Sequence, residues 1–108
     1  MAFADNLKQL PGIAHLAGLQ LLDATGQIVA TIENKPGQAG SLSIYNHLGH
    51  IHGAITADAA RKGLELYAEH ADDAHQNPGK HPNIDRLLAL AAGDIGTLRV
   101  KHIFATGE

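Results

Sequence analysis

Residues 18–32 have the sequence GLQLLDATGQIVATI, and this segment decides the fold because it predicts a β-hairpin. Two apolar runs flank the tetrapeptide Asp23-Ala24-Thr25-Gly26. An aspartate opens a turn by accepting hydrogen bonds from its own backbone, and a glycine supplies the positive φ that closes one. The segment therefore predicts two paired strands, near residues 18–23 and 27–33.

Two further segments alternate polar and apolar residues, as strands with one buried face do. These are residues 41–46 (SLSIYN) and residues 97–104 (TLRVKHIF). Short strands of this kind, with helices placed between and after them, are typical of an antiparallel or mixed sheet that is covered on one side. We therefore expect a sheet of three to four strands, mostly antiparallel.

Apolar residues at helical spacing predict three helices, over residues 3–10, 57–76 and 82–92. Thr56 is a suitable N-cap for the longest of them, and Gly93 is a suitable residue to end the last one. The predicted fold class is α+β: a small, mostly antiparallel sheet with helices packed on one face. A chain of 108 residues predicts a single domain over residues 1–108.

The composition predicts a protein of the reducing cytoplasm. The chain has no cysteine, so it has neither disulfides nor thiolate metal ligands. Its beginning lacks the basic region and apolar run of a signal peptide, and no stretch approaches the roughly 18 apolar residues that a membrane span needs. The net charge is −3 and the eight Lys and Arg residues are scattered, which argues against nucleic-acid binding.

Histidines are the candidate functional residues, and the chain has eight of them. If the strand at 41–46 continues past Gly49, His50 and His52 point to the same face. Two such imidazoles hold one divalent cation when a third ligand arrives from elsewhere, and the candidates for that ligand are His70 and His102. Imidazole ligands suggest zinc or manganese. The alternative for each histidine is a neutral ring hydrogen-bonded at the edge of the core.

A metal-free site is a second interpretation, because neutral histidine is the usual general acid and base near pH 7. His50 or His52, with Tyr45, Lys80 or Arg86, would then move protons on a small carbonyl or sugar substrate. Both interpretations predict an enzyme acting on a small polar metabolite, with His50, His52 and Tyr45 as its catalytic residues. The opposing hypothesis is a non-catalytic homodimeric interaction module whose histidines are structural.

The homodimer itself follows from the predicted one-sided helical cover. Such a cover leaves the other face of the sheet open, and an exposed apolar face favours pairing with a second copy. The candidate residues for that face are Leu22, Val29, Tyr45, Ile51 and Ile103.

One local resemblance concerns the histidines. Residues 49–53 (GHIHG) resemble the His-x-His motif of the cupin family, which implies a metal held by His50 and His52. Cupins carry a glutamate four or five residues further on, where this chain has Thr56 and Ala57. The resemblance therefore places no cupin residue beyond the two histidines.

A second resemblance extends over the whole chain and is carried by residues 45–49 (YNHLG) and 77–82 (NPGKHP). With these segments the chain resembles a small family of bacterial proteins of unknown function. The resemblance implies a bacterial cytosolic protein, with aldose–ketose isomerisation as one candidate reaction. It assigns no role to any residue.

Overall fold

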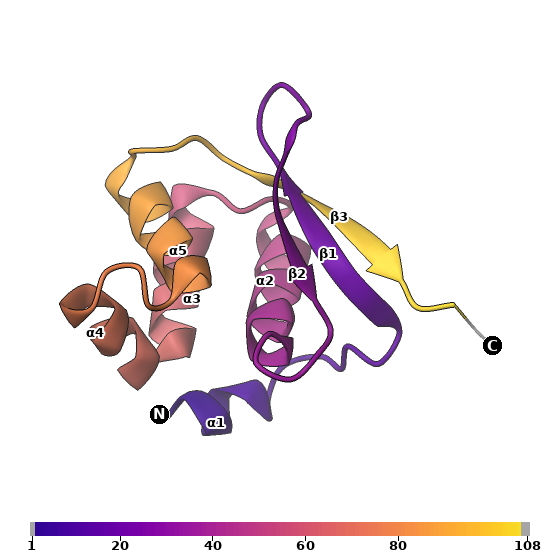
Figure 1. Cartoon of the computed structure of the whole chain (residues 1–108), viewed down its shortest axis with the longest axis horizontal. Coiled ribbons are helices and arrows are strands. Elements are labelled where there is room, and N and C mark those ends of the chain that lie inside the picture. The colour runs from indigo at the N-terminus through magenta and orange to yellow at the C-terminus, as the bar shows by residue number, and fades with distance from the viewer. Residues whose placement is uncertain (1, 107–108) are drawn as a thin grey trace.

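A computed structural model describes residues 2–106 of the chain (Figure 1). These residues form five helices and three strands, in the order α1 (Phe3–Leu7), β1 (Leu16–Leu22), β2 (Ile28–Glu33), α2 (Ala39–His52), α3 (Ala57–Tyr67), α4 (Glu69–Gln76), α5 (Pro82–Ala92) and β3 (Arg99–Phe104). None of these helices is long and apolar enough to cross a membrane.

The sheet has the strand order β2-β1-β3, and both pairings are antiparallel. The predicted hairpin is confirmed together with its turn chemistry. One carboxylate oxygen of Asp23 accepts hydrogen bonds from the backbone N–H groups of Thr25 and Gln27, at 2.9 and 3.0 Å, and Gly26 has a φ of +86°. The α+β class and the antiparallel sheet are thereby confirmed, with three strands in residues 2–106.

The prediction of a strand at 41–46 was wrong, because these residues lie inside helix α2. This helix is buried on two sides: Asn46 accepts a hydrogen bond from His102 of β3, and Leu48 packs against Gly63 of α3. A helix with two buried sides carries apolar residues over a broad arc and shows no single apolar stripe. The alternation in residues 41–46 therefore imitated a half-buried strand.

The molecule consequently has helices in successive layers on the sheet. Helix α2 lies against the sheet, and α3 and α5 lie beyond it (Figure 1). The core runs through this stack and includes Leu19, Leu21 and Ile32 from the sheet and Leu87 and Leu90 from α5. The predicted cover of one face by the two later helices is thus modified, because α2 separates them from the sheet.

The predicted helix over residues 57–76 is divided into α3 and α4 by Ala68, which has φ +52° and ψ −119°. Buried residues continue across the break, from Tyr67 to Ala71, so the apolar pattern alone does not reveal it. Helix α1 contacts both sides of the break, and its Asn6 side chain supplies a hydrogen-bond partner for a carbonyl in the last turn of α3. The side chain of Asn6 donates to the carbonyl of Leu66 at 3.0 Å, and the backbone N–H of Phe3 donates to a carboxylate oxygen of Glu69 at 2.9 Å.

The backbone conformation of Ala68 is one that residues with a Cβ rarely adopt, and such strain costs on the order of 1–3 kcal/mol. We expect Ala68→Gly to raise the free energy of unfolding by about 1 kcal/mol in a denaturant titration. Ala89→Gly, inside helix α5, is the matched control and should lower it by about 1 kcal/mol. If both variants lowered the free energy of unfolding equally, the proposed backbone strain at Ala68 would be contradicted.

Candidate active site

His50 and His52 do not share a face as predicted, because they lie on a helix rather than a strand. Two residues apart on a helix means about 200° around its axis, so the side chains leave in nearly opposite directions. Both residues are exposed, in the last turn of α2. The expectation that His50 and His52 share a face depended on a strand that continues past Gly49, and these residues lie in helix α2 instead.

Two of the four predicted metal ligands do line the same cavity, of about 330 Å³, next to β3. His50 and His102 contribute to it, together with His15, whereas His70 lines a different cavity. The ring of His102 donates through Nε2 to the side-chain oxygen of buried Asn46 at 2.8 Å. Residues 2–106 contain no group of three or more His, Asp or Glu side chains placed to hold a metal ion. A divalent metal on these histidines stays a prediction.

Tyr45 was expected on the open face of the sheet, but it is fully buried between α2 and α5. Its hydroxyl donates to the backbone carbonyl of Asn83 at 2.5 Å and accepts a hydrogen bond from Arg86 at 3.1 Å. Burial raises its pKa to about 12, against the opposing effect of the Arg86 charge. The hydroxyl is therefore committed to contacts inside the protein.

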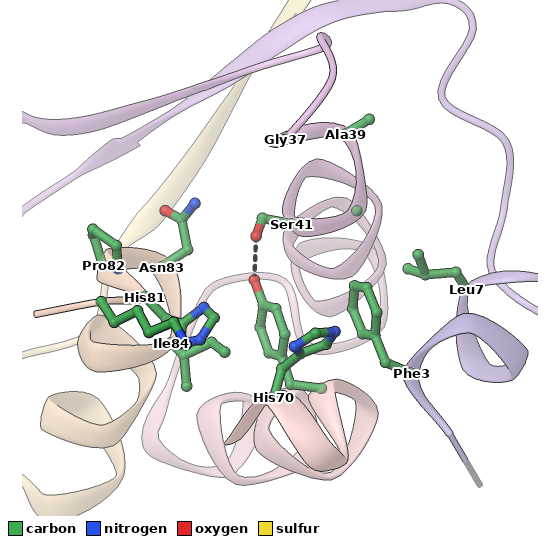
Figure 2. A pocket seen from close by; sticks show the side chains of 13 residues that line it. Phe3, Leu7, Gly37, Ala39, Ser41, His70, His81, Pro82, Asn83 and Ile84 are labelled. Atoms are coloured by element: carbon green, nitrogen blue, oxygen red, sulfur yellow. Dashed lines mark hydrogen bonds between the residues drawn. The ribbon is translucent and has the colours of Figure 1, made fainter. Parts of the chain in front are cut away.

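A cavity of about 440 Å³ surrounds His70, and Figure 2 shows the side chains that line it. We call it the His70–His81 cavity, because the rings of these two histidines lie 5.9 Å apart there, centroid to centroid. Its walls come from α1, from the beginning of α2 and of α5, and from the α3–α4 break. No hydrogen bond within residues 2–106 uses the ring nitrogens of His70, which leaves them available to a ligand.

His81 is held in place by Asp73. The Nε2–H of His81 donates to a carboxylate oxygen of Asp73 at 2.6 Å, and Lys80 forms an ion pair with the same oxygen at 2.9 Å. The hydrogen bonds from His81 and then Lys80 lower the pKa of Asp73 to about 2, so its carboxylate is ionised at neutral pH. Because Nε2 carries the hydrogen, the neutral ring has its lone pair on Nδ1. An imidazole oriented in this way is suited to act as a general base.

A serine hydroxyl also reaches the His70–His81 cavity. Tyr67 donates its hydroxyl hydrogen to the Ser41 oxygen at 2.6 Å, which is the dashed line in Figure 2. Burial raises the pKa of Tyr67, so the phenol keeps its proton and remains the donor. The hydrogen of Ser41 is then free to point at a ligand oxygen.

Phe3 closes the apolar side of this cavity. Its ring stacks on Tyr67 at 5.7 Å and meets His70 edge-on at 4.6 Å, centroid to centroid. Gly40 at the beginning of α2 permits this approach, because a Cβ there would lie 2.9 Å from the Phe3 ring. The arrangement packs one side of the His70 ring against an aromatic side chain.

Of the residues in this cavity, the sequence had identified His70 as a candidate metal ligand and Lys80 as a candidate partner in proton transfer. His81 and Asp73 were missed because they are eight residues apart across the turn that ends α4, a spacing that matches neither a helix nor a strand. The only sequence signal for His81 was its place in the segment 77–82 that carried the whole-chain resemblance.

The model of a family described as "Uncharacterized protein conserved in bacteria (DUF2322)" matches residues 3–102. The chain belongs to this family. Membership confirms the resemblance drawn from the sequence and covers all the cavity residues discussed above. No curated protein and no solved structure matches the chain.

The lowered pKa of Asp73 makes its contribution to stability depend on pH. A carboxyl group with a depressed pKa in the folded state stabilises the fold above its unfolded pKa of about 3.8, and this contribution disappears as the pH falls to about 2. We expect Asp73→Asn to lower the melting temperature at pH 7, and expect the wild-type and variant values to converge between pH 4 and pH 2. Asp72→Asn, on the exposed side of α4, is the control that should change little. If the melting temperatures of the wild-type protein and Asp73→Asn differed by the same amount at every pH, the stabilising effect of the ionised Asp73 carboxylate would be contradicted.

Proposed function

We propose that this protein is a small bacterial cytosolic enzyme that moves protons on a small polar metabolite bound in the His70–His81 cavity. The observation that carries the proposal is the convergence of two histidines, one of them oriented by an ionised carboxylate. Pairs of titratable groups in one cavity, with one of them held by hydrogen bonds, are typical of acid–base catalysis. The proposal keeps the histidine-based chemistry expected from the sequence and moves its centre from His50 and His52 to His70 and His81.

The three polar groups of the cavity have complementary roles in this proposal. The Nδ1 atom of His81 accepts a proton from the substrate, since its Nε2–H is bound to Asp73. His70 exchanges a proton with a substrate oxygen, and the Ser41 hydroxyl donates a hydrogen bond to that oxygen. Asp73 does not touch the substrate and is a positioning residue.

Aldose–ketose isomerisation is the candidate reaction that fits these roles. His81 removes the proton from the hydroxyl-bearing carbon next to the carbonyl, while His70 protonates the carbonyl oxygen, and an enediol results. His81 then returns its proton to the neighbouring carbon as His70 takes one from the other hydroxyl. The two steps conserve protons and electrons, so the reaction needs neither an oxidant nor a further reactant. A divalent metal on His50 and His52 is not required for any of these steps.

The reaction can be tested through solvent exchange. Enediol formation in D₂O replaces the C2 proton of an aldose with deuterium, which ¹H NMR detects as loss of that signal. We expect exchange with at least one of glyceraldehyde, ribose 5-phosphate and glucose 6-phosphate, slowed roughly 100-fold or more in His81→Gln. His75→Gln is the matched control, since His75 is an exposed histidine on α4 outside the cavity. No exchange by the wild-type protein, or an equal loss in His75→Gln, would contradict the proposal.

A second candidate function is the homodimeric interaction module, and one observation favours it. Because β1 is the central strand, β2 and β3 each have an outer edge without a partner strand within residues 2–106. Three large apolar side chains on these strands are exposed, Ile28 by 55%, Val29 by 49% and Phe104 by 67%. A second copy could continue the sheet at such an edge.

Light scattering during size-exclusion chromatography tests the dimer. We expect twice the mass of one chain at high micromolar concentration, and the monomer mass for a variant with lysine at an edge position, Ile28→Lys. Thr31→Lys, on the same strand and also exposed, is the control for added charge. A monomer mass for the wild-type protein at that concentration would refute the dimer.

A further inference from the structure

A second large cavity, of about 580 Å³, lies between the turn of the β1–β2 hairpin and the α5–β3 connection. It shares no lining residue with the His70–His81 cavity. Part of its wall is apolar and comes from Val29, Ile95 and Leu98. Val29 is 49% exposed and Ile95 is 41% exposed, so these aliphatic side chains meet solvent when the cavity is empty. An apolar wall of this kind suits an aliphatic ligand.

One cation, Arg86 of helix α5, also lines this cavity and is fixed in position. Its Nη1 atom donates to the Tyr45 hydroxyl at 3.1 Å and to the side-chain oxygen of Asn83 at 2.9 Å. Its guanidinium also lies over the Tyr45 ring, 5.6 Å from the centroid. Both hydrogens of Nη1 are thereby used, and the long side chain is held before any ligand arrives.

The hydrogen bonds of Arg86 leave the other side of its guanidinium without a partner in the described part of the chain. Within residues 2–106, neither Nε nor Nη2 donates a hydrogen bond, and no carboxylate forms an ion pair with this side chain. The Nε–H and Nη2–H groups point in parallel, which is the geometry that binds both oxygens of one carboxylate. A fixed guanidinium with this side unused, next to an apolar wall, fits a ligand that has one anionic end and one aliphatic end.

Asp23 limits the charge of that ligand. Asp23 lines the same cavity, and the hydrogen bonds from Thr25 and Gln27 lower the pKa of its carboxyl group, so it stays ionised. One of its oxygens is occupied by these bonds within the turn. A nearby negative charge opposes a phosphate dianion more strongly than a carboxylate monoanion.

We propose that this cavity binds a short-chain aliphatic monocarboxylate, with its carboxylate on the Nε and Nη2 atoms of Arg86 and its alkyl chain on Val29, Ile95 and Leu98. This site is independent of the proposed proton-transfer reaction, and the two proposals are tested by separate experiments.

The proposal is tested on the full chain by ¹H–¹⁵N NMR titration with sodium hexanoate, 1-hexanol and hexyl phosphate. Hexanoate should shift the amide signals of residues 95–98 and the Nε–H signal of Arg86. Its dissociation constant should be at least about tenfold lower than those of hexanol and hexyl phosphate. Shortening the acid from hexanoate to acetate should weaken binding, by up to about fourfold per methylene removed. Equal affinity for hexanoate and hexanol, or hexanoate shifts confined to the His70–His81 cavity, would overturn it.

Variants assign the binding to this site. Arg86→Gln should raise the dissociation constant for hexanoate at least about tenfold, whereas Arg61→Gln, an exposed arginine on α3, should leave it unchanged. Because Arg86 also supports Tyr45, a second variant addresses the apolar wall. Ile95→Ser, at a largely exposed position, should preserve the amide spectrum of the fold and weaken hexanoate binding severalfold. Equal weakening in Arg61→Gln, or unchanged affinity in Ile95→Ser, would contradict the proposed site.

Discussion

The burial of helix α2 on two sides is the constraint on which the rest of the structure depends. Its sheet side meets β3 through the hydrogen bond between Asn46 and His102, and its other side meets α3. The second contact requires Gly63 of α3, because a Cβ there would lie 2.8 Å from methyl groups of both Leu48 and Leu87. One glycine thus lets α2, α3 and α5 approach one another, and α5 contributes residues to both of the larger cavities.

The strained turn at Ala68 has a similar organising role for the candidate active site. The break ends α3 at Tyr67 and begins α4 at Glu69, so that the residues on either side belong to separate helices. Tyr67 then lines the cavity from the end of one helix and His70 from the beginning of the next, where Asp73 also holds the ring of His81. The hydrogen bond from Asn6 of α1 to the Leu66 carbonyl offsets part of the cost of the break, and the bond from Phe3 to the Glu69 side chain connects α1 to α4. Strain of this kind is characteristic of positions that build a site.

A short network of hydrogen bonds joins the two cavities. Asn83 lines the His70–His81 cavity, and its side chain accepts a hydrogen bond from Arg86, which lines the other one. Tyr45 binds both residues from the buried face of α2, through the Asn83 carbonyl and the Arg86 guanidinium. The first turn of α5 is therefore common to a candidate catalytic site and a candidate carboxylate site.

The sequence by itself determined the elements whose signals are local. The Asp23–Gly26 turn and its flanking strands were predicted correctly, as were the helix that begins at Pro82 and the strand that includes His102, because turn chemistry and single-stripe periodicity depend on neighbouring residues. Only the tertiary structure decided that residues 39–52 form a helix, since their burial depends on two partners at once. Only the tertiary structure brought His70, Asp73 and His81 together, because a turn at Ala68 and a loop after α4 separate them. Periodicity describes which side of an element is buried, whereas a site depends on where the ends of different elements meet.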